Sequence, residues 1–576
     1  MAEIKETSPR TNVYITLPDK RIMCAPLGTK LKDIIASAYP EDPYLYLAAL
    51  CDNVMHTLNY APRRDVFLEP LTRKHELGRL VYNRSLVLLM VTAFKEVFPE
   101  QKVFTDYRRP MGGLFCRTSS PVSREDLKKV EDKMREMVND DIPVDFEEKT
   151  IEEGEKILLE EKEEDKIYFL KTIAEKAKKN TAWFVRVGKY FDYFHGPLVV
   201  SMGYLRRLAL RSTPSGFILV PSQTDVKRAE AMAEKVTLVD AAFRRAVKLA
   251  NQLEVGTVPQ LNEIIKKGET HEGILVSESA QSSQITAIAR EIAERGAVKL
   301  VLIAGPSSSG KTTFSKRLAI ALQTCGIKPV TLEMDRYFVE RDKTPRDEKG
   351  EYDFESIHAM DLTLLDHDLN ELIAGREVTL PKYDFITGTR SVGPKLRLKE
   401  SQILIAEGIH GLNPLLTQGI PAESIFRIYI SPLTPLNLDR HHHISTSDSR
   451  MIRRIVRDAR TRGHSAEQTI MRWASIRRGE YKNIFPYQEQ ADAIFNSMFL
   501  YELCVLKPIA EPLLLQISKE SPAYPKADSL LRLLSFFEPM GTQLIPENSI
   551  LREFVGGSSL ERYLPGQFES YWSIDN

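Results

Sequence analysis

The chain of 576 residues is too long for one hydrophobic core, so we expect roughly three or four domains. Its 79 basic and 79 acidic residues cancel, which excludes a global basic field for nucleic-acid binding and leaves only a local patch open. Five scattered cysteines, none in a Cys-x-x-Cys pair, indicate free thiols in a reducing compartment and no zinc framework.

The first residues contain no apolar targeting segment, and no run of about 20 apolar residues follows, so we expect a cytoplasmic protein without a membrane partner. A small α+β module comes next, with a helix that Thr29 or Asp33 would cap. Its expected elements are strand Asn12–Leu17, turn Pro18–Lys20, helix Thr29–Ala38 and strands Leu45–Cys51 and Val66–Glu69. This order, with Gly-Thr-x-Leu-x-Asp-Ile-Ile at the helix, resembles the TGS domain of threonyl-tRNA synthetase and certain GTPases. The resemblance implies a β-grasp module over residues 1–72.

Residues 73–222 resemble the N-terminal editing-type domain of threonyl- and alanyl-tRNA synthetases, through a helix at Asn83–Pro99 and a strand at Tyr190–Pro197. In those enzymes an H-x-x-x-H pair and a Cys/His pair converge on one site. The matching positions here hold Leu88, Thr92, Phe194 and Leu198. Because these side chains cannot ligate a metal or move a proton, we expect no metal-type editing chemistry. The neighbouring His195 is expected to pack or to form a hydrogen bond.

Charged residues dominate positions 123–180, above all 147–179, which predicts a solvated helical insertion rather than an RNA-binding tail. An amphipathic helix is expected over 224–252, followed by a bridging helix near 260–267 and another over 280–295. We therefore expect a helical connector at 223–284.

Residues 299–315, KLVLIAGPSSSGKTTFS, carry the strongest motif of the chain. A buried strand leads into Gly-x-x-x-x-Gly-Lys-Thr, and an amphipathic segment follows. Backbone N–H groups of such a loop and the positive end of the next helix bind phosphate, and the Lys-Thr pair reaches the phosphates and Mg²⁺. We therefore expect a nucleoside triphosphate site. Its residues are Gly305, Pro306, Ser307, Ser308, Ser309, Gly310, Lys311, Thr312 and Thr313.

Alternating strands and helices over 285–490 predict an α/β fold with a parallel sheet and helices on both faces. The expected strands are Lys299–Ala304, Pro329–Met334, Gln402–Ala406 and Ile425–Ile430. Ligands bind at the carboxyl ends of such strands. Asp335 stands there as a candidate general base, and Glu407 as a candidate magnesium-side acid. A loop or helix-cap role for Asp335 is the alternative.

Four motifs in order resemble the uridine kinase and phosphoribulokinase family: Gly-Pro-Ser-Ser-Ser-Gly-Lys-Thr-Thr, Met-Asp-Arg-Tyr-Phe, Leu-Pro-Lys-Tyr-Asp-Phe-x-Thr-Gly-Thr-Arg and Ile-Ala-Glu-Gly-Ile-His. The resemblance implies a P-loop kinase that uses ATP and Mg²⁺ to phosphorylate a hydroxyl of a small molecule, typically the 5′-hydroxyl of a nucleoside. It assigns catalysis to Asp335 and Lys311, and Mg²⁺ to Thr312 and Glu407. It assigns the substrate to Tyr337, Glu355, Tyr383, Phe385 and Arg390.

Two departures from the family pattern affect the substrate. Uridine-cytidine kinases have a base-contacting histidine where this chain has Gly388, and their sugar-contacting aspartate is Glu355 here. A glycine offers no side-chain donor to a pyrimidine edge, so we expect weak selectivity for pyrimidines.

Residues 448–462 place several arginines at helical spacing, among them Arg450, Arg453 and Arg457. A similar segment in the family is the lid that closes over the triphosphate, which implies cofactor binding by these three; a solvated basic helix or an RNA patch is the alternative. Just before it, His441, His442 and His443 cannot all face one ion on regular structure, so no metal site is expected.

Together these features predict a multidomain protein in which a P-loop domain at 285–495 is followed by an extension at 496–576. The extension is expected to hold helices near 498–517 and 525–537, then strand-like pieces, and no chemistry. The expected activity is ATP-dependent phosphorylation of a nucleoside. A sugar-phosphate kinase of the phosphoribulokinase type and an ATP-switched RNA- or ribosome-associated regulator stay open, as do RNA binding by the first half and assembly into a homo-oligomer.

Overall fold

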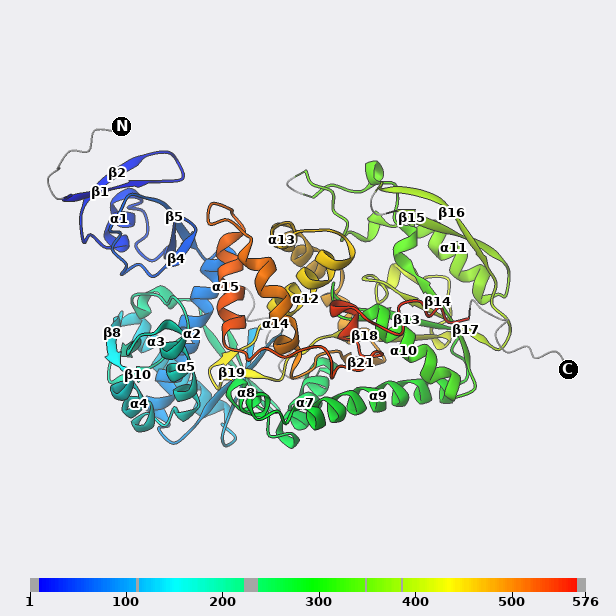
Figure 1. Cartoon of the computed structure of the whole chain (residues 1–576), viewed down its shortest axis with the longest axis horizontal. Coiled ribbons are helices and arrows are strands. Elements are labelled where there is room, and N and C mark those ends of the chain that lie inside the picture. Colours follow the sequence, from blue (N-terminus) through cyan, green and yellow to red (C-terminus); the bar gives the residue numbers. More distant parts are fainter. Residues whose placement is uncertain (1–9, 110–112, 222–236, 348–349, 385–386, 567–576) are drawn as a thin grey trace. The chain divides into compact units, whose positions relative to one another are not determined.

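The computed structural model describes residues 10–109, 113–221, 237–347, 350–384 and 387–566 (Figure 1). The chain divides into two compact units. We call the first the front unit; it comprises residues 1–235, 438–443 and 517–529. We call the second the P-loop unit; it comprises residues 236–437, 444–516 and 530–576. The domain boundaries expected from the sequence stay predictions.

The front unit opens with a mixed five-stranded sheet in the order β2-β1-β5-β3-β4, in which β1 and β5 are parallel and the other neighbours antiparallel. Its elements are β1 (Asn12–Thr16), β2 (Ile22–Pro26), α1 (Leu31–Ala38), β3 (Tyr46–Cys51), β4 (Val54–His56) and β5 (Val66–Thr72). The predicted strands and helix are confirmed, whereas the predicted cap is wrong. The N-cap of α1 is Lys30, without a side-chain hydrogen bond, because the Thr29 hydroxyl donates to the carbonyl of Pro26 instead. The TGS assignment stays a prediction.

The rest of the front unit contains the long helix α2, which supplies many side chains of a hydrophobic core. Two further sheets have the orders β10-β9-β8 and β11-β12-β7-β6. The elements are α2 (Glu76–Val97), β6 (Val103–Arg109), β7 (Gly113–Thr118), α3 (Arg124–Asn139), β8 (Val144–Thr150), α4 (Ile151–Glu160), α5 (Ile167–Ala177), β9 (Thr181–Val187), β10 (Tyr190–Asp192), β11 (Ala209–Thr213) and β12 (Gly216–Val220). Among the described helices, only α2 is long and apolar enough to cross a membrane. Because 78% of the residues in its most apolar stretch are buried, α2 is a core helix.

The prediction of a solvated helical insertion over 123–180 is wrong at Val144–Thr150, since β8 is a strand paired antiparallel with β9. Cross-strand ion pairs explain why so charged a sequence forms a strand. Arg186 on β9 contacts Asp145 at 2.7 Å and Glu147 at 2.6 Å, both on β8. Opposite charges directly across a ladder stabilise the pairing. Helices α4 and α5 follow where helical structure was expected.

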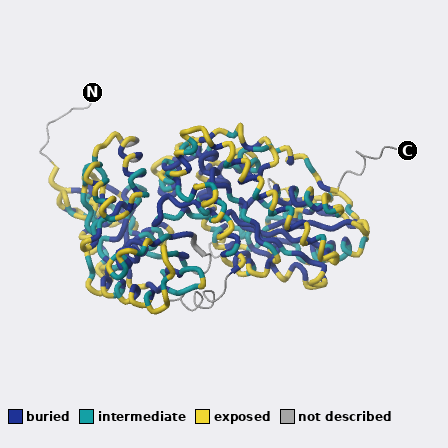
Figure 2. Tube along the Cα trace, turned by 90° about the horizontal axis from the view of Figure 1, so that it is seen from below, coloured by how far each residue is buried: buried dark blue, intermediate teal, exposed yellow. Residues whose placement is uncertain are grey.

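A parallel sheet in the order β14-β17-β13-β18-β21 forms the centre of the P-loop unit. Its strands are β13 (Leu300–Ala304), β14 (Lys328–Glu333), β17 (Gln402–Glu407), β18 (Ile425–Ser431) and β21 (Ala493–Asn496). All four predicted strands are confirmed, and β21 is the fifth strand of the sheet. Interior stretches of the chain such as these strands are buried, and outer loops are exposed (Figure 2). Helix α10 (Lys311–Thr324) packs against β13, β14 and β17.

The P-loop unit also contains α7 (Leu238–Gln252), α8 (Val258–Lys267), α9 (Thr270–Arg295), α11 (Leu362–Ile373), β15 (Val378–Asp384), β16 (Thr389–Leu396), α12 (Thr446–Thr461), α13 (Ala466–Asn483), α14 (Glu502–Leu515) and α16 (Arg552–Val555). Helix α15 (Tyr524–Ser535) and the short strand β19 (Asn437–Asp439) contain residues of both units, and the short strand β20 (His442–His443) belongs to the front unit. Of the helix predicted over 224–252, the part up to residue 236 lies outside the described residues. The strand-like pieces predicted after residue 537 are wrong as far as residue 566, where the chain forms turns and α16.

Candidate active site at the carboxyl edge of the parallel sheet

Strand register brings three predicted site segments to one edge of the sheet. Glu407, the last residue of β17, pairs with Ile303 of β13 on one side and with Glu333 of β14 on the other. Because parallel strands all end at the same edge, the loop after β13, the turn after β14 and the end of β17 emerge together. That loop begins at Gly305, and that turn contains Asp335.

The loop after β13 has the backbone that a phosphate-binding loop requires. A Cβ at Gly305 would lie 2.3 Å from the carbonyl oxygen of Ile430, so only glycine fits there. Ser308 and Gly310 adopt left-handed φ values of 59° and 88°. Gly310 is the N-cap of α10, so the first N–H groups of that helix face the loop. The Lys311 ammonium donates to the carbonyl of Gly305 at 3.1 Å.

Thr312 and Glu407 meet beneath the loop. The Thr312 hydroxyl donates to Glu407 Oε1 at 2.8 Å. Burial raises the pKa of Glu407 to about 8, and the Lys311 charge opposes this shift. A hydroxyl and a carboxylate side by side at a phosphate loop are the oxygen donors that Mg²⁺ prefers, so these two residues fit that ion.

Asp335 lies in the short 3₁₀ turn η3 (Met334–Tyr337) that follows β14. Burial raises the pKa of Asp335, and the charges of Lys311, Arg462 and Arg457 act in the opposite direction. The carboxylate is therefore within the field of the loop lysine and of helix α12. A carboxylate in this position can accept a proton from a hydroxyl group.

Glu355 is a further acid near the loop, since the charges of Lys311 and Asp335 both act on its pKa. Burial raises its pKa to about 7, with Glu480 acting in the same direction and Arg454 opposing. A Cβ at Gly479 of α13 would lie 2.1 Å from the Cβ of Glu355. The absence of a side chain at Gly479 therefore lets Glu355 sit against α13.

The predicted substrate residues do not all reach one place. Tyr337 is fully buried, and its hydroxyl donates to Asp368 at 2.9 Å, so it belongs to the core beneath the site. Tyr383 packs on Phe338 with ring centroids 5.7 Å apart, and Phe338 also contacts Phe354 at 6.4 Å. These three rings form an aromatic cluster. The predicted Phe385 lies outside the described residues.

Arg390 and Gly388 lie on and beside the hairpin of β15 and β16. The Arg390 guanidinium donates to Asp361 at 2.9 Å, which fixes it in an ion pair. At Gly388, a Cβ would lie 2.6 Å from Nε of Arg341, and the Arg341 N–H donates to the Gly388 carbonyl at 3.0 Å. The space beside position 388 is thus taken by an arginine side chain.

Helix α12 carries the predicted lid arginines, and two of them are buried. Arg450 forms an ion pair with Glu480, and Arg453 forms one with Glu502. The side chains of both arginines are at most 1% exposed. Arg450 also donates to the Ser307 carbonyl at 2.9 Å, and Arg453 donates to the carbonyl of the next residue. These two arginines hold the backbone of the loop rather than facing its open side.

The next turns of α12 approach the loop with other arginines. Arg454 donates to the Ser307 hydroxyl at 2.6 Å. Asp458 lies between Arg454 and Arg457 and accepts a hydrogen bond from each, at 3.1 and 2.9 Å. Arg457 and Arg462 both act on the pKa of Asp335. The arginines whose charges act at the site are therefore 454, 457 and 462.

The C-terminal extension contributes a carboxylate to the loop. Glu553 of α16 accepts hydrogen bonds from the Thr313 N–H at 3.1 Å and from its hydroxyl at 2.9 Å. The Thr313 N–H lies in the first turn of α10, where a helix presents its N–H groups to anions. Glu553 thus accepts from one of the N–H groups at the start of α10.

Sequence reasoning missed several residues that reach the site, or the side chains that shape it, from far along the chain. Glu480, Glu502, Glu553 and Arg341 belong to no motif, and each acquires its role only through folding. A charge count around 480 and 502 gives no sign that these acids are buried partners. The one usable signal was Gly388, a glycine where the resemblance requires a side chain.

Known proteins match the part of the chain that contains this site. The model of the Phosphoribulokinase / Uridine kinase family matches residues 300–502. A uridine kinase of Chloroflexus aggregans is 30% identical over 203 residues, which cover 34% of this chain and 85% of that protein. A structure described as a possible uridine kinase from Bacillus stearothermophilus shares 22% identity, with a TM-score of 0.24, over 34% of this chain and 89% of that one.

A second kind of relative matches as well. A threonine–tRNA ligase of Symbiobacterium thermophilum is 28% identical over 208 residues, which cover 36% of this chain and 31% of the ligase. The chain thus spans about a third of the length of that relative.

Breaking the buried Arg453–Glu502 pair should destabilise the P-loop unit. In Glu502→Ala the Arg453 charge loses its partner in the interior, so we expect the free energy of unfolding to fall by about 3–5 kcal/mol. Denaturant unfolding of the purified chain measures this. The pair Arg376–Glu371 gives the control, because a solvent-exposed ion pair contributes little and Glu371→Ala should leave the free energy of unfolding nearly unchanged. Equal losses of stability in the two variants would contradict a structural role for the buried Arg453–Glu502 pair.

Removing the charge of Glu553 should strengthen ATP binding. Glu553→Gln keeps the side-chain length but takes a negative charge away from the helix N-terminus, so we expect the Kd for ATP to fall by about 10-fold. Isothermal titration calorimetry measures this value. Glu561→Gln, in the same segment with a side chain that is 65% exposed, should leave it unchanged. An unchanged or higher Kd in Glu553→Gln would show that the contact does not compete with phosphate.

Proposed function

Because the chain belongs, through residues 300–502, to the phosphoribulokinase and uridine kinase family, we propose that it transfers the γ-phosphate of ATP to a hydroxyl group of a nucleoside. The observation that carries the proposal is the meeting of Lys311, the Thr312–Glu407 pair and Asp335 at one edge of the parallel sheet. These are the parts that phosphoryl transfer needs, a phosphate clamp, an Mg²⁺ site and a base.

The loop residues bind and orient the triphosphate. The Lys311 ammonium lies against the loop carbonyls and can turn to donate to the β- and γ-phosphates, while the backbone N–H groups at the start of α10 bind phosphate oxygens. Arg457 and Arg462 add positive charge, which lowers the pKa of Asp335 against the effect of burial. Arg450 and Arg453 keep the loop in shape from behind.

Asp335 takes the proton of the acceptor hydroxyl. Its carboxylate stands at the end of the strand next to Glu407, within the field of the loop lysine. Removing the hydroxyl proton makes the oxygen a better nucleophile for in-line attack on the γ-phosphorus. Mg²⁺, when bound by Thr312 and Glu407, neutralises the charge of the phosphates.

The aromatic cluster of Phe338, Phe354 and Tyr383 supports an acceptor with a planar base. The Phe338 ring lies 5.7 Å from that of Tyr383 and 6.4 Å from that of Phe354, and aromatic faces stack on any base without strong preference. Arg341 stands where a histidine side chain would have to lie at position 388, and a guanidinium donates two parallel hydrogen bonds to a base edge. The acceptor we propose is therefore a nucleoside whose base offers acceptor atoms to an arginine.

A sugar phosphate is the second candidate acceptor, and Arg341 is the observation that favours it. A guanidinium binds a phosphate group by a bidentate, charge-assisted contact. The same residue could thus anchor a phosphorylated sugar in the manner expected of a phosphoribulokinase-type enzyme, with the aromatic cluster against the sugar ring.

We propose that the front unit consists of a TGS-like module followed by an editing-like domain without editing chemistry. The similarity to a threonine–tRNA ligase supports this assignment. The four positions that would carry editing chemistry support the loss of activity, since each is buried in the hydrophobic core of the unit. They are Leu88, Thr92, Phe194 and Leu198. A cytoplasmic location is proposed with it.

Two substitutions test the kinase proposal. Lys311→Ala should abolish ATP turnover while the fold survives, because the lysine stands on a loop and its loss opens no cavity.

Asp335→Asn should keep ATP binding and lower kcat by about 100-fold or more. Steady-state kinetics with ATP binding measured separately checks both. Near-normal turnover in folded Lys311→Ala sinks the phosphate-loop assignment, and near-normal kcat in Asp335→Asn places the base elsewhere.

The acceptor is identified by a substrate panel with Arg341→Ala. We expect kcat/KM to be highest for a nucleoside, with pyrimidine over purine selectivity below about 10³-fold because no histidine stands at position 388. Arg341→Ala should change the ranking among bases. Arg376→Ala, in an exposed ion pair, should leave it unchanged. If only phosphorylated sugars react, and Arg341→Ala raises their KM, the phosphoribulokinase-type reading replaces the nucleoside one.

A further inference from the structure

Residues 438–443 belong to the front unit, although residues on both sides of them belong to the P-loop unit. Within the front unit the segment is tied to β6, where the Thr105 N–H donates to the Arg440 carbonyl at 2.8 Å. The three consecutive histidines lie in this segment. We expected that the three histidines could not all bind one ion. His441 and His442 indeed lie in two different groups of side chains.

The group around His441 already contains its cation. Lys166, which is fully buried, forms an ion pair with Asp192 and lies 2.8 Å from His441 Nδ1. Glu163 is 3.5 Å from the same ammonium and 3.1 Å from the Arg440 guanidinium. With two cations placed between two carboxylates, this group needs no metal ion.

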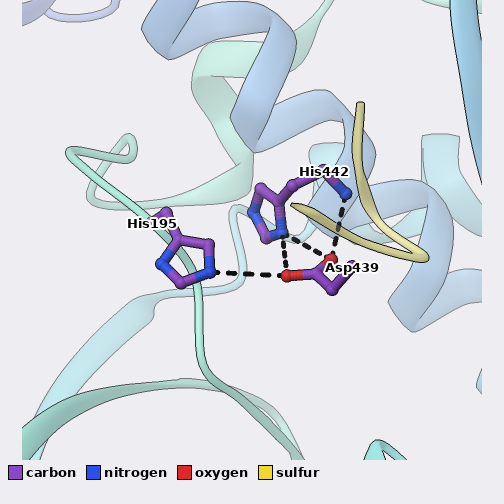
Figure 3. A group of neighbouring side chains, drawn as sticks. All are labelled: His195, Asp439 and His442. Carbon is purple, nitrogen blue, oxygen red and sulfur yellow. Dashed lines mark hydrogen bonds and ion pairs between the residues drawn. The ribbon is translucent and has the colours of Figure 1, made fainter. Parts of the chain in front are cut away.

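The group around His442 is built differently. Asp439 is fully buried, and its two carboxylate oxygens face the imidazoles of His442 and His195 (Figure 3). Nδ1 of His442 lies 2.8 Å from both oxygens, and Nε2 of His195 lies 3.4 Å from Oδ2. The backbone N–H groups of His441 and His442 donate to Oδ1 at 2.8 and 3.0 Å, which fixes the carboxylate. Among the described residues, no ammonium or guanidinium forms an ion pair with Asp439.

The ionisation of this group suits a cation. Burial alone would raise the pKa of Asp439, but His442, His195 and Lys166 hold it well below its usual range, so the carboxylate is charged. Burial lowers the pKa of His442 to about 4, so its imidazole is neutral near pH 7. A charged carboxylate and a neutral imidazole are the forms in which these side chains bind metals.

The spacing also suits a transition metal. Ligand atoms at about 2.1 Å from a tetrahedral zinc ion are separated by roughly 3.4 Å. The three ligand atoms of this group all lie within 4.8 Å of one another, and the two contacts to Asp439 are 2.8 and 3.4 Å. All three side chains are at most 11% exposed, so the group is in place without a large movement of the chain.

We propose that His195, Asp439 and His442 bind one divalent transition-metal ion in the front unit. Two imidazole nitrogens and one carboxylate oxygen are borderline ligands that favour Zn²⁺ over Mg²⁺ or Ca²⁺. With three protein ligands, a fourth position stays open for water or a ligand. The ion would bring the 438–443 segment and the loop that carries His195 together.

The site differs from the one that the editing-type resemblance suggested. Phe194, at one of the four editing positions, packs its ring 4.5 Å from that of His442 and supplies no ligand. Of the three proposed ligands, only His195 lies within residues 1–222. A fragment of those residues therefore lacks the site, whereas the full chain has it.

Zinc binding by the full chain tests the proposal. The chain is stripped with a chelator and titrated with Zn²⁺ in excess Mg²⁺, which keeps the oxygen ligands at Thr312 and Glu407 filled. We expect about one tightly bound Zn²⁺ per chain. His195→Gln and His442→Gln should each weaken binding by more than about 100-fold, beyond the effect of losing a residue that only supports a ligand. His443→Gln, the next residue of the same run and outside the group, is the matched control.

A second readout does not depend on the stoichiometry. Saturating Zn²⁺ should raise the Tm of the stripped wild-type chain and of His443→Gln, but not that of His195→Gln. Co²⁺ bound to the wild-type chain should show the strong visible absorption of a tetrahedral site, which tests the proposal even if a variant fails to fold. The proposal is overturned if the wild-type chain binds no more Zn²⁺ than His195→Gln, or if Co²⁺ gives no such spectrum. The three side chains would then be a hydrogen-bonded imidazole–carboxylate group.

Discussion

The phosphate loop depends on two arginines that solvent does not reach. Arg450 and Arg453 approach it from behind, donate to the carbonyls of Ser307 and Ser308, and are themselves neutralised by Glu480 and Glu502. A buried guanidinium without a carboxylate would carry a large desolvation penalty, so the four side chains work only as a set. They tie the loop to α12, α13 and α14, and the shape of the site follows from that connection.

This arrangement explains which parts of the site could be predicted. Strand ends, the glycine-rich loop and Asp335 follow from local pattern, because parallel strands always bring their carboxyl ends to one edge. Helical spacing also showed that α12 presents a row of arginines. It could not show which of them face the phosphate, because the acids that bury Arg450 and Arg453 lie about 30 and 49 residues away in sequence. The residue that fills the place of a side chain at 388, Arg341, is equally remote.

The errors elsewhere have the same origin. The segment around Glu147 looked helical because its charges could pair at helical spacing, whereas Arg186 of a neighbouring strand supplied better partners. The sequence predicted only that three consecutive histidines cannot bind one ion together. In the structure, His441 and His442 do lie in two different groups of side chains. The partners Asp439 and His195 came into view only with the fold, since one lies outside the run and the other more than 240 residues before it. The local sequence pattern therefore predicts helices and strands well. It predicts poorly which charged residues pair over long distances in sequence.

Residues 438–443 also have a consequence for how the protein is made. They and residues 517–529 complete the front unit, yet each segment is reached only after long stretches that belong to the P-loop unit. A ribosome releases the chain from its N-terminus, so residues 1–235 emerge first and must wait for these later segments. Until they arrive, the buried charges of Asp192 and Glu163 have no Arg440 or His441 beside them. The front unit is thus the first whose synthesis begins, yet it cannot be complete before residues 517–529 have been made.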